Sequence, residues 1–70
     1  MSITDLMENF EIQGMYHIKK WDNDNDVYVT LAEGMDFEID YYNFIKEEYL
    51  EAEITYMYAI DKVLNIEVRL

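Results

Sequence analysis

Apolar and polar residues alternate most clearly at the carboxyl-terminal end of the sequence. This period of two is typical of a half-buried antiparallel strand. Residues 53–60 are rich in β-branched and aromatic residues, and only Asp61 and Lys62 separate them from residues 63–70. The pattern therefore predicts a hairpin over Glu53–Ile60 and Val63–Leu70. The alternating apolar residues of the last strand are Leu64, Ile66, Val68 and Leu70.

The register of this hairpin determines where two tyrosines point. A two-residue loop makes Ile60 and Val63 the closing pair of the hairpin. Counting back from that pair places Tyr56 and Tyr58 opposite polar residues of the last strand. We therefore expect both tyrosines to be exposed on the less apolar face of the sheet. The opposing residues are Glu67 for Tyr56 and Asn65 for Tyr58.

A second hairpin is predicted nearer the amino terminus. Residues compatible with a strand dominate from Glu11 to Trp21, and Val27–Leu31 resumes the alternation. The intervening Asp22–Asp26 contains only Asp and Asn, which favour turns. Gly14 is the expected site of a β-bulge in the first strand. We expect two paired strands with an acidic tip.

Two helices are expected outside the hairpins. The capping-box pattern from Ser2 to Asp5 predicts a helix over about Ile3–Asn9, with Leu6 and Phe10 facing the core. Residues 35–50 fit both a strand and a helix, because their apolar residues alternate at first and then follow helical spacing. We divide this segment into an extended piece through about Asp40 and a helix through about Leu50.

These elements predict an α+β fold: a mostly antiparallel sheet of about four strands, a short amino-terminal helix and a helix between the two hairpins. A chain of 70 residues without proline, repeats or a linker is expected to form one domain over residues 1–70. Cysteine is absent, so disulfides cannot stabilise this small core. Stability must come from good packing or from self-association.

The net charge of -11 limits the classes of partner. It opposes direct binding to nucleic acid or to an anionic membrane, and favours a basic partner or a multivalent cation. No apolar stretch is long enough to span a membrane, and the first ten residues do not resemble a signal peptide because Asp5 and Glu8 interrupt them. We therefore expect a cytoplasmic protein.

The acidic turn partly matches a calcium-binding loop. Acidic or oxygen-bearing residues occupy the ligand positions of an EF-hand loop that begins at Asp22 and ends at Glu33. The sixth position requires glycine, and Val27 stands there instead. The flanking segments also resemble strands rather than helices. We therefore interpret the segment as a solvated turn and expect no metal site and no cofactor.

No catalytic constellation is evident. His17 is the only histidine, and without cysteine the chain lacks the usual ligands of a zinc site. Ser2 is the only serine and lies at the terminus, so no serine triad is indicated. Neighbouring carboxylates such as Glu47 and Glu48 arise from composition alone, because 16 of 70 residues are acidic. We expect a protein that is not an enzyme.

The distribution of acidic residues is the most suggestive feature for function. If extended, Asp36, Glu38 and Asp40 would repeat every ~6.6 Å along one face, a spacing comparable to that of phosphates along a nucleic-acid strand. Two further acidic groups could extend this surface. They are Glu47, Glu48 and Glu51 on the proposed helix, and Asp22, Asp24 and Asp26 in the turn. The alternative is that these charges serve solubility only.

Several segments resemble small uncharacterised acidic proteins that are encoded on bacteriophage and conjugative elements of Gram-positive gut bacteria. The resemblance covers about half of the chain, and it implies a mobile-element setting without implying an activity or any functional residue. It is carried by Glu11–Gly14, Ile18–Trp21, Ile54–Ala59 and Asp61–Val68.

The sequence therefore favours a non-enzymatic binding protein that engages a basic protein surface. Its most concrete form is a nucleic-acid-mimicking inhibitor from a mobile element, with a nucleic-acid-binding protein as the partner. The alternative is a small structural or regulatory subunit that self-associates as a homodimer, or docks through an aromatic sheet face. In that alternative Tyr56 and Tyr58 form the contact surface together with Tyr16 or Tyr28.

Overall fold

The structure is a computed structural model that describes residues 1–70. Its elements in chain order are α1 (Ile3–Asn9), β1 (Tyr16–Asp22), β2 (Val27–Gly34), α2 (Phe37–Asn43), α3 (Glu47–Glu51), β3 (Glu53–Ile60) and β4 (Val63–Arg69). The strands form one sheet in the order β2-β1-β4-β3. Each hairpin is antiparallel, and the central strands β1 and β4 are parallel. The predicted α+β fold with two hairpins is confirmed, although two short helices stand where one was expected.

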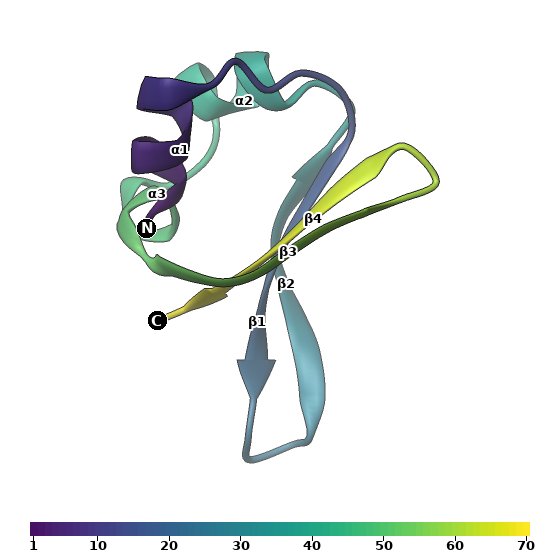
Figure 1. The fold of residues 1–70 in the computed structure, drawn as a ribbon. Coiled ribbons are helices and arrows are strands. Elements are labelled where there is room, and N and C mark those ends of the chain that lie inside the picture. The colour runs from purple at the N-terminus through teal and green to yellow at the C-terminus, as the bar shows by residue number, and fades with distance from the viewer.

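The three helices lie together on one side of the sheet, and the tips of both hairpins extend beyond them (Figure 1). The core lies between these helices and the sheet, because alternate residues of β1 and β4 point toward the helices. Ile18 and Ile66 are paired across the two strands and are fully buried. The core cluster consists of Ile3, Tyr16, Ile18, Phe37, Ile45, Leu50, Ala52, Ile66 and Val68.

Helix α1 begins as its sequence predicts. The Ser2 side chain accepts a hydrogen bond from the Asp5 backbone N–H, and the Asp5 carboxylate accepts one from the Ser2 N–H, which completes the capping box. Leu6 is buried as expected. The expectation that Phe10 faces the core is wrong, since Phe10 is 62% exposed. It is the C-cap of α1 and has an extended backbone, so it leaves the apolar side of the helix.

Strand β1 begins at Tyr16, five residues later than expected. Gly14 lies outside the strand with φ of 94°, a conformation that glycine adopts without steric cost. Its carbonyl accepts the Phe37 N–H, so Gly14 is tied to the start of α2. The expected bulge at Gly14 is therefore wrong. The register shift lies between Ile18 and Lys19, where Leu31 is the extra residue of β2.

Residues 35–43 are the largest correction to the predicted fold. Asp36 caps a helix that starts at Phe37, whereas an extended piece was expected through Asp40. The Phe37 side chain is fully buried and its ring packs edge-on against Tyr16, with the centroids 5.2 Å apart. Burying this ring and capping the helix outweigh the local alternation of apolar and acidic residues.

The second hairpin has the predicted register. Asp61 and Lys62 both adopt positive φ, as a two-residue turn of this kind requires. Tyr56 pairs with Glu67 and Tyr58 with Asn65, which confirms the predicted partners. A register shift between Ile54 and Tyr56 was not expected. It lets Ile54 pack against the core while Tyr56 points away from it.

None of the helices is both long and apolar enough to cross a membrane.

Candidate functional site

The face of the sheet opposite the helices carries a group of exposed aromatic side chains. We call this surface the open face and define its aromatic residues as Trp21, Tyr28, Tyr56 and Tyr58. None of the four belongs to the core cluster or to the residues packed against it. All are exposed, Tyr56 most at 68% and Tyr58 least at 38%. The predicted exposure of Tyr56 and Tyr58 is confirmed.

Lys19 lies at the centre of the open face and orders the rings around it. Its Nζ donates a hydrogen bond to the Tyr58 hydroxyl at 2.6 Å. The same ammonium lies 4.5 Å from the centroid of the Tyr28 ring and 5.0 Å from that of Tyr58. Lys19 is only 8% exposed, so these cation–π contacts form largely out of water, where they are strongest. One side chain thus links β2 to β3 across the two central strands.

Trp21 and Tyr28 form the second ordered pair of the open face. They are direct partners in the β1–β2 ladder, and their rings meet edge to face with centroids 4.9 Å apart. Desolvation, followed by the charge of Glu67, raises the pKa of the Tyr28 phenol. Tyr28 therefore presents a neutral hydroxyl beside an acidic residue. The expectation that Tyr16 could join this surface is wrong, because Tyr16 is buried on the other face.

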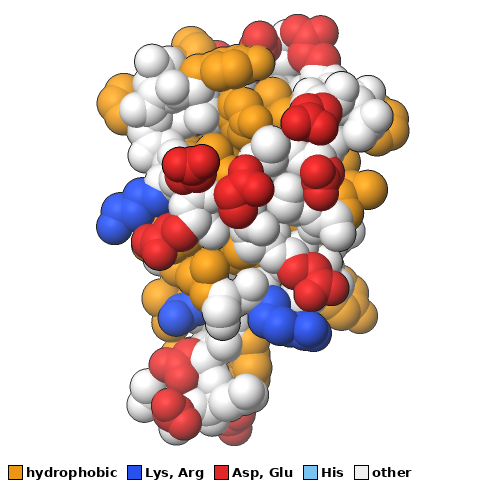
Figure 2. Space-filling view, turned by 90° about the vertical axis from the view of Figure 1, so that its left-hand side faces the viewer, with side chains coloured by type: hydrophobic (Ala, Val, Ile, Leu, Met, Phe, Trp, Pro, Cys, Tyr) orange, Lys and Arg blue, Asp and Glu red, His pale blue; other side chains and the backbone are white.

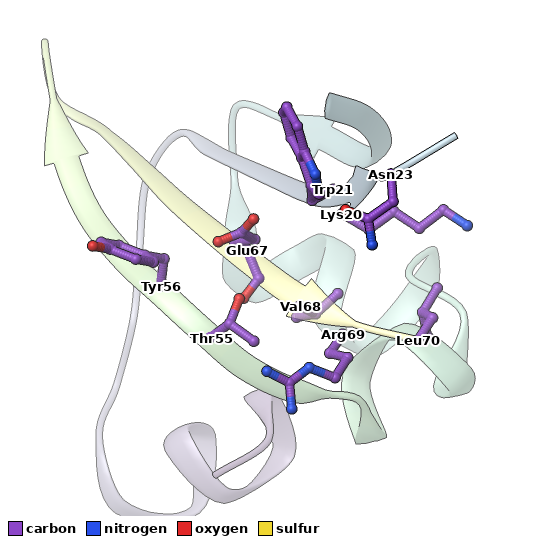
Figure 3. A pocket seen from close by; sticks show the side chains of 9 residues that line it. All are labelled: Lys20, Trp21, Asn23, Thr55, Tyr56, Glu67, Val68, Arg69 and Leu70. Atoms are coloured by element: carbon purple, nitrogen blue, oxygen red, sulfur yellow. The ribbon is translucent and has the colours of Figure 1, made fainter. Parts of the chain in front are cut away.

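A cleft of about 640 Å³ lies at one end of the open face (Figure 3). It forms where β1 and β4 diverge, since their pairing ends at Lys19 and Glu67. The basic side chains of Lys20 and Arg69 line it together with Trp21. The lining residues are Lys20, Trp21, Asn23, Thr55, Tyr56, Glu67, Val68, Arg69 and Leu70.

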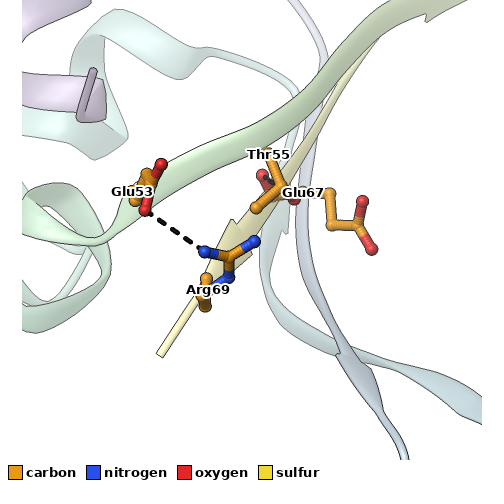
Figure 4. Close-up of polar contacts among 4 residues, drawn as sticks. All are labelled: Glu53, Thr55, Glu67 and Arg69. Atoms are coloured by element: carbon orange, nitrogen blue, oxygen red, sulfur yellow. Dashed lines mark hydrogen bonds and ion pairs between the residues drawn. The ribbon is translucent and has the colours of Figure 1, made fainter.

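Arg69 is held only loosely at the edge of this cleft. Its Nη1 lies 3.6 Å from the Oε2 of Glu53, and both side chains are largely exposed (Figure 4). Such an exposed pair contributes little to stability, so Arg69 can reorient toward a ligand at small cost. Two of the five basic residues of the chain, Lys20 and Arg69, thus lie at this end of the sheet, beside the acidic Glu67 and Glu53.

The predicted row of Asp36, Glu38 and Asp40 does not exist as an extended row. Asp36 is the N-cap of α2 and accepts the Ile39 N–H. Asp40 accepts a hydrogen bond from the Tyr16 hydroxyl at 2.6 Å. Glu38 accepts one from Gln13 Nε2 at 3.3 Å. The helix replaces the expected strand spacing, and two of the three carboxylates stabilise the fold.

The acidic tip of the first hairpin is a structured turn. Asp22 accepts hydrogen bonds from the Asp24 N–H and from Asn25 Nδ2. The hydrogen bond from Asn25, ahead of that from the Asp24 backbone, lowers the pKa of Asp22. Strands flank the turn as predicted, and Val27 is already part of β2. No three acidic or histidine side chains lie close enough together to hold a metal ion.

The predicted acidic groups are not brought together. The turn with Asp22, Asp24 and Asp26 lies at the far end of the β1–β2 hairpin, while Glu47, Glu48 and Glu51 belong to α3 among the helices. On the face shown in Figure 2, separate acidic side chains are scattered over the body and at the hairpin tip, and several Lys and Arg side chains lie between the two. Glu51 is partly used within the fold, because it accepts a hydrogen bond from Thr4 at 2.7 Å.

Lys19 and Trp21 are the functional candidates that the sequence prediction missed. A signal for both was present, because they alternate with Ile18 and therefore point away from the core. What the sequence did not contain was the strand order. Only the parallel pairing of β1 with β4 places Lys19 within reach of Tyr58 on β3.

His17, the only histidine, has its Nε2 2.8 Å from the Thr30 hydroxyl, and no carboxylate is hydrogen-bonded to its ring. The open face combines exposed aromatic rings, the ammonium of Lys19 and neighbouring carboxylates such as Glu67. Aromatic residues are enriched in protein interfaces. No family model, curated protein or solved structure matches the chain.

Proposed function

We propose that this chain is a non-enzymatic binding protein that docks onto a partner protein through the open face. The supporting observation is the set of four exposed aromatic side chains, with Lys19 holding the rings of Tyr28 and Tyr58. Aromatic residues carry much of the binding energy in protein interfaces. Rings that are already ordered lose little conformational freedom on binding, which favours affinity.

The charge of the molecule indicates what surrounds the contact on the partner. Glu67 lies among the aromatic residues, since it is the ladder partner of both Lys19 and Tyr56. Glu33 and Glu53 lie farther along the strands, and the net charge is -11. A partner with an apolar centre and basic residues around it complements this arrangement, and electrostatic attraction accelerates its association. The proposal thus keeps the basic partner that the sequence favours, and moves the contact from the acidic row to the sheet.

The nucleic-acid-mimicking form of the function rested on an extended row of Asp36, Glu38 and Asp40, to which the acidic groups of the turn and of α3 would add. Since Asp36 and Asp40 serve α2 and Tyr16 instead, we base the proposal on the open face. The mobile-element setting and the cytoplasmic location stay predictions.

The test is recovery of a partner from a lysate of the source organism with the parent chain and two matched variants. Trp21→Ser/Tyr28→Ser removes one aromatic pair from the open face. Tyr42→Ser/Phe44→Ser removes two exposed aromatic residues at α2. We expect the open-face variant to bind the recovered partner at least about thirtyfold more weakly, as loss of a binding hot spot of ~2 kcal/mol implies. The α2 variant should bind like the parent chain.

A partner that is lost with the α2 variant and kept by the open-face variant would contradict this proposal. Salt provides a second measurement. If basic residues of the partner face Glu33, Glu53 and Glu67, raising the ionic strength from about 50 to 500 mM should slow association more than it speeds dissociation.

A further inference from the structure

The outer edge of β3 is an unprotected strand edge. β3 is the last strand of the sheet, and the hairpin that it forms with β4 extends away from the helices (Figure 1). The chain start covers only its first residues, through a bridge between Ser2 and Glu53 and a hydrogen bond from the Ile54 N–H to the Met1 carbonyl at 2.8 Å. All residues from Thr55 to Ile60 are exposed.

This edge lacks the features that usually prevent strand pairing. Natural edge strands carry charged residues or proline, or are kept very short. No charged residue and no proline occurs from Ile54 to Ile60, although 30% of the chain is charged. Met57 and Ile60 are among the exposed large apolar residues. The edge is apolar on both faces, because Met57 and Ala59 point to the opposite side from Tyr56 and Tyr58.

Some backbone N–H and C=O groups of this edge point away from β4 and are free to form hydrogen bonds with another strand. Ile60 and Val63 close a two-residue loop and so exchange hydrogen bonds with each other. Hydrogen bonding alternates along an antiparallel strand, so Tyr58 and Tyr56 also direct their backbone groups toward β4. The backbone groups of Met57 and Ala59 therefore point outward, to the side where the sheet has no further strand.

We propose that β3 pairs with β3 of a second copy of this chain, antiparallel and centred on Tyr58. In this register Tyr58 lies opposite Tyr58, and Met57 lies opposite Ala59 of the second copy. Met57 and Ala59 then form about four backbone hydrogen bonds across the two-fold axis. Every side chain meets an apolar side chain, so two molecules of charge -11 meet without opposing carboxylates.

The other free edge of the sheet does not fit a second copy in this way. β2 is interrupted by the extra residue Leu31, which leaves Val27–Thr30 as its longest regular stretch. Pairing these residues with themselves would bring the acidic tip with Asp26 near Glu33 of the other copy, and like charges that face each other across strands are destabilising. Because β3 carries no charge and β2 lies beside acidic residues, we assign the contact between the two copies to the edge of β3.

The pairing would also add stability to a chain whose core is small. Only 12 of 70 residues are buried, and self-association is a common way to stabilise such a chain. Because Tyr58 pairs with Tyr58, the two side chains point to the same face. The open faces of both copies therefore lie on the same side of a continuous eight-stranded sheet. The dimer would offer two aromatic surfaces side by side. This inference does not depend on what the open face binds.

Sedimentation equilibrium of the parent chain from about 10 µM to 1 mM tests the proposal. Because five residues per strand bury less area than a standard interface, we expect a weak dimer with a dissociation constant in the upper part of that range. Screening of the net charge should make the dimer at least about tenfold tighter at 500 mM salt than at 50 mM. Docking of a basic partner has the opposite salt dependence, so the two proposals can fail separately.

The variant Met57→Lys/Ala59→Lys places an ammonium opposite an ammonium in both pairs that flank the central Tyr58 pair. It should remain monomeric even though its net charge is smaller, and these two side chains do not lie on the open face. The control Ile39→Lys/Tyr42→Lys makes the same change of charge at α2 and should dimerise at least as well as the parent chain. If both variants dimerise equally, or if the parent chain is monomeric at 1 mM in high salt, the proposal is wrong.

Hydrogen exchange of the parent chain gives a result that does not depend on any variant folding. The amides of Met57 and Ala59 should become protected as the protein concentration rises, because only the second copy can accept their hydrogen bonds. The amide of Tyr58 should change little, since β4 already accepts its hydrogen bond. Equal protection of all three amides at every concentration would overturn the assigned edge and register.

Discussion

At the scale of single residues, one hydrogen bond connects the sheet to α2. The hydroxyl of the buried Tyr16 donates to Asp40, and burial together with this hydrogen bond raises the pKa of the Tyr16 phenol well above its usual range. The bond forms against the backbone of Gly34, the ladder partner of Tyr16. Glycine is needed there for space, since an added Cβ would meet the Asp40 carboxylate and the Tyr16 ring.

We predict that Gly34→Ala lowers the free energy of unfolding by about 1–3 kcal/mol, because the new methyl group forces the Tyr16–Asp40 pair apart. Urea unfolding followed by circular dichroism measures the change. Tyr16→Phe provides the control, because it removes the hydroxyl and keeps the ring. In the double variant the two costs should not add, since both act on the same contact. Additive costs would contradict this explanation.

At the scale of elements, the helices are too short to be stable alone and depend on their caps and on the core. α1 has seven residues, and its capping box ties Ser2 to Asp5. The backbone N–H of Ser2, and then its hydroxyl, lower the pKa of the Asp5 carboxyl from its ordinary value of 3.8. The ionised form of Asp5 is therefore favoured by folding.

We predict that Asp5→Asn removes a part of the stability that depends on pH. A carboxyl whose pKa is lowered by folding stabilises the protein above its unfolded pKa of 3.8, and this contribution is lost as the pH falls through the folded value. The parent chain should therefore be more stable than the variant near pH 6, and the two should converge below about pH 3. Thermal unfolding across this range measures the difference. A constant difference would show that the ionised carboxylate does not support the cap.

At the scale of the whole molecule, charge opposes folding. The acidic residues outnumber the basic ones by 11, and only one ion pair forms, between Arg69 and Glu53. Crowding these charges into a molecule 34 Å long costs free energy that salt reduces.

We predict that the melting temperature rises with sodium chloride from about 20 to 500 mM, by about 4–8 °C for each kcal/mol of repulsion that is screened. A variant with Asp24→Asn, Glu47→Gln and Glu48→Gln serves as the control, because it removes three exposed charges. Its melting temperature should be higher in low salt and should respond less to salt. Scanning calorimetry at about 10 µM protein keeps the β3 pairing from contributing. An equal response in both proteins would mean that the salt acts in some other way.

The two hairpins and α1 could be predicted from the sequence because their signals are local. The closing turn at Asp61 and Lys62 fixes the register of its hairpin, and the capping box fixes the start of α1. Exposure of Tyr56 and Tyr58 followed from that register alone. The acidic surface could be predicted in composition but not in arrangement, since residues 36–40 are ambiguous without their tertiary contacts.

The sequence by itself determined the class of fold, the pairing within each hairpin and the excess of negative charge, because these depend on neighbouring residues or on composition. Only the tertiary structure decided that Phe37 enters the core and turns the expected acidic row into a helix. It also decided that β1 and β4 lie side by side, which brings Lys19 to Tyr58 and leaves the edge of β3 free. The physical reason is that the order of the strands depends on which apolar residues share one core. The free energy gained by burying them comes from residues that lie far apart in the chain.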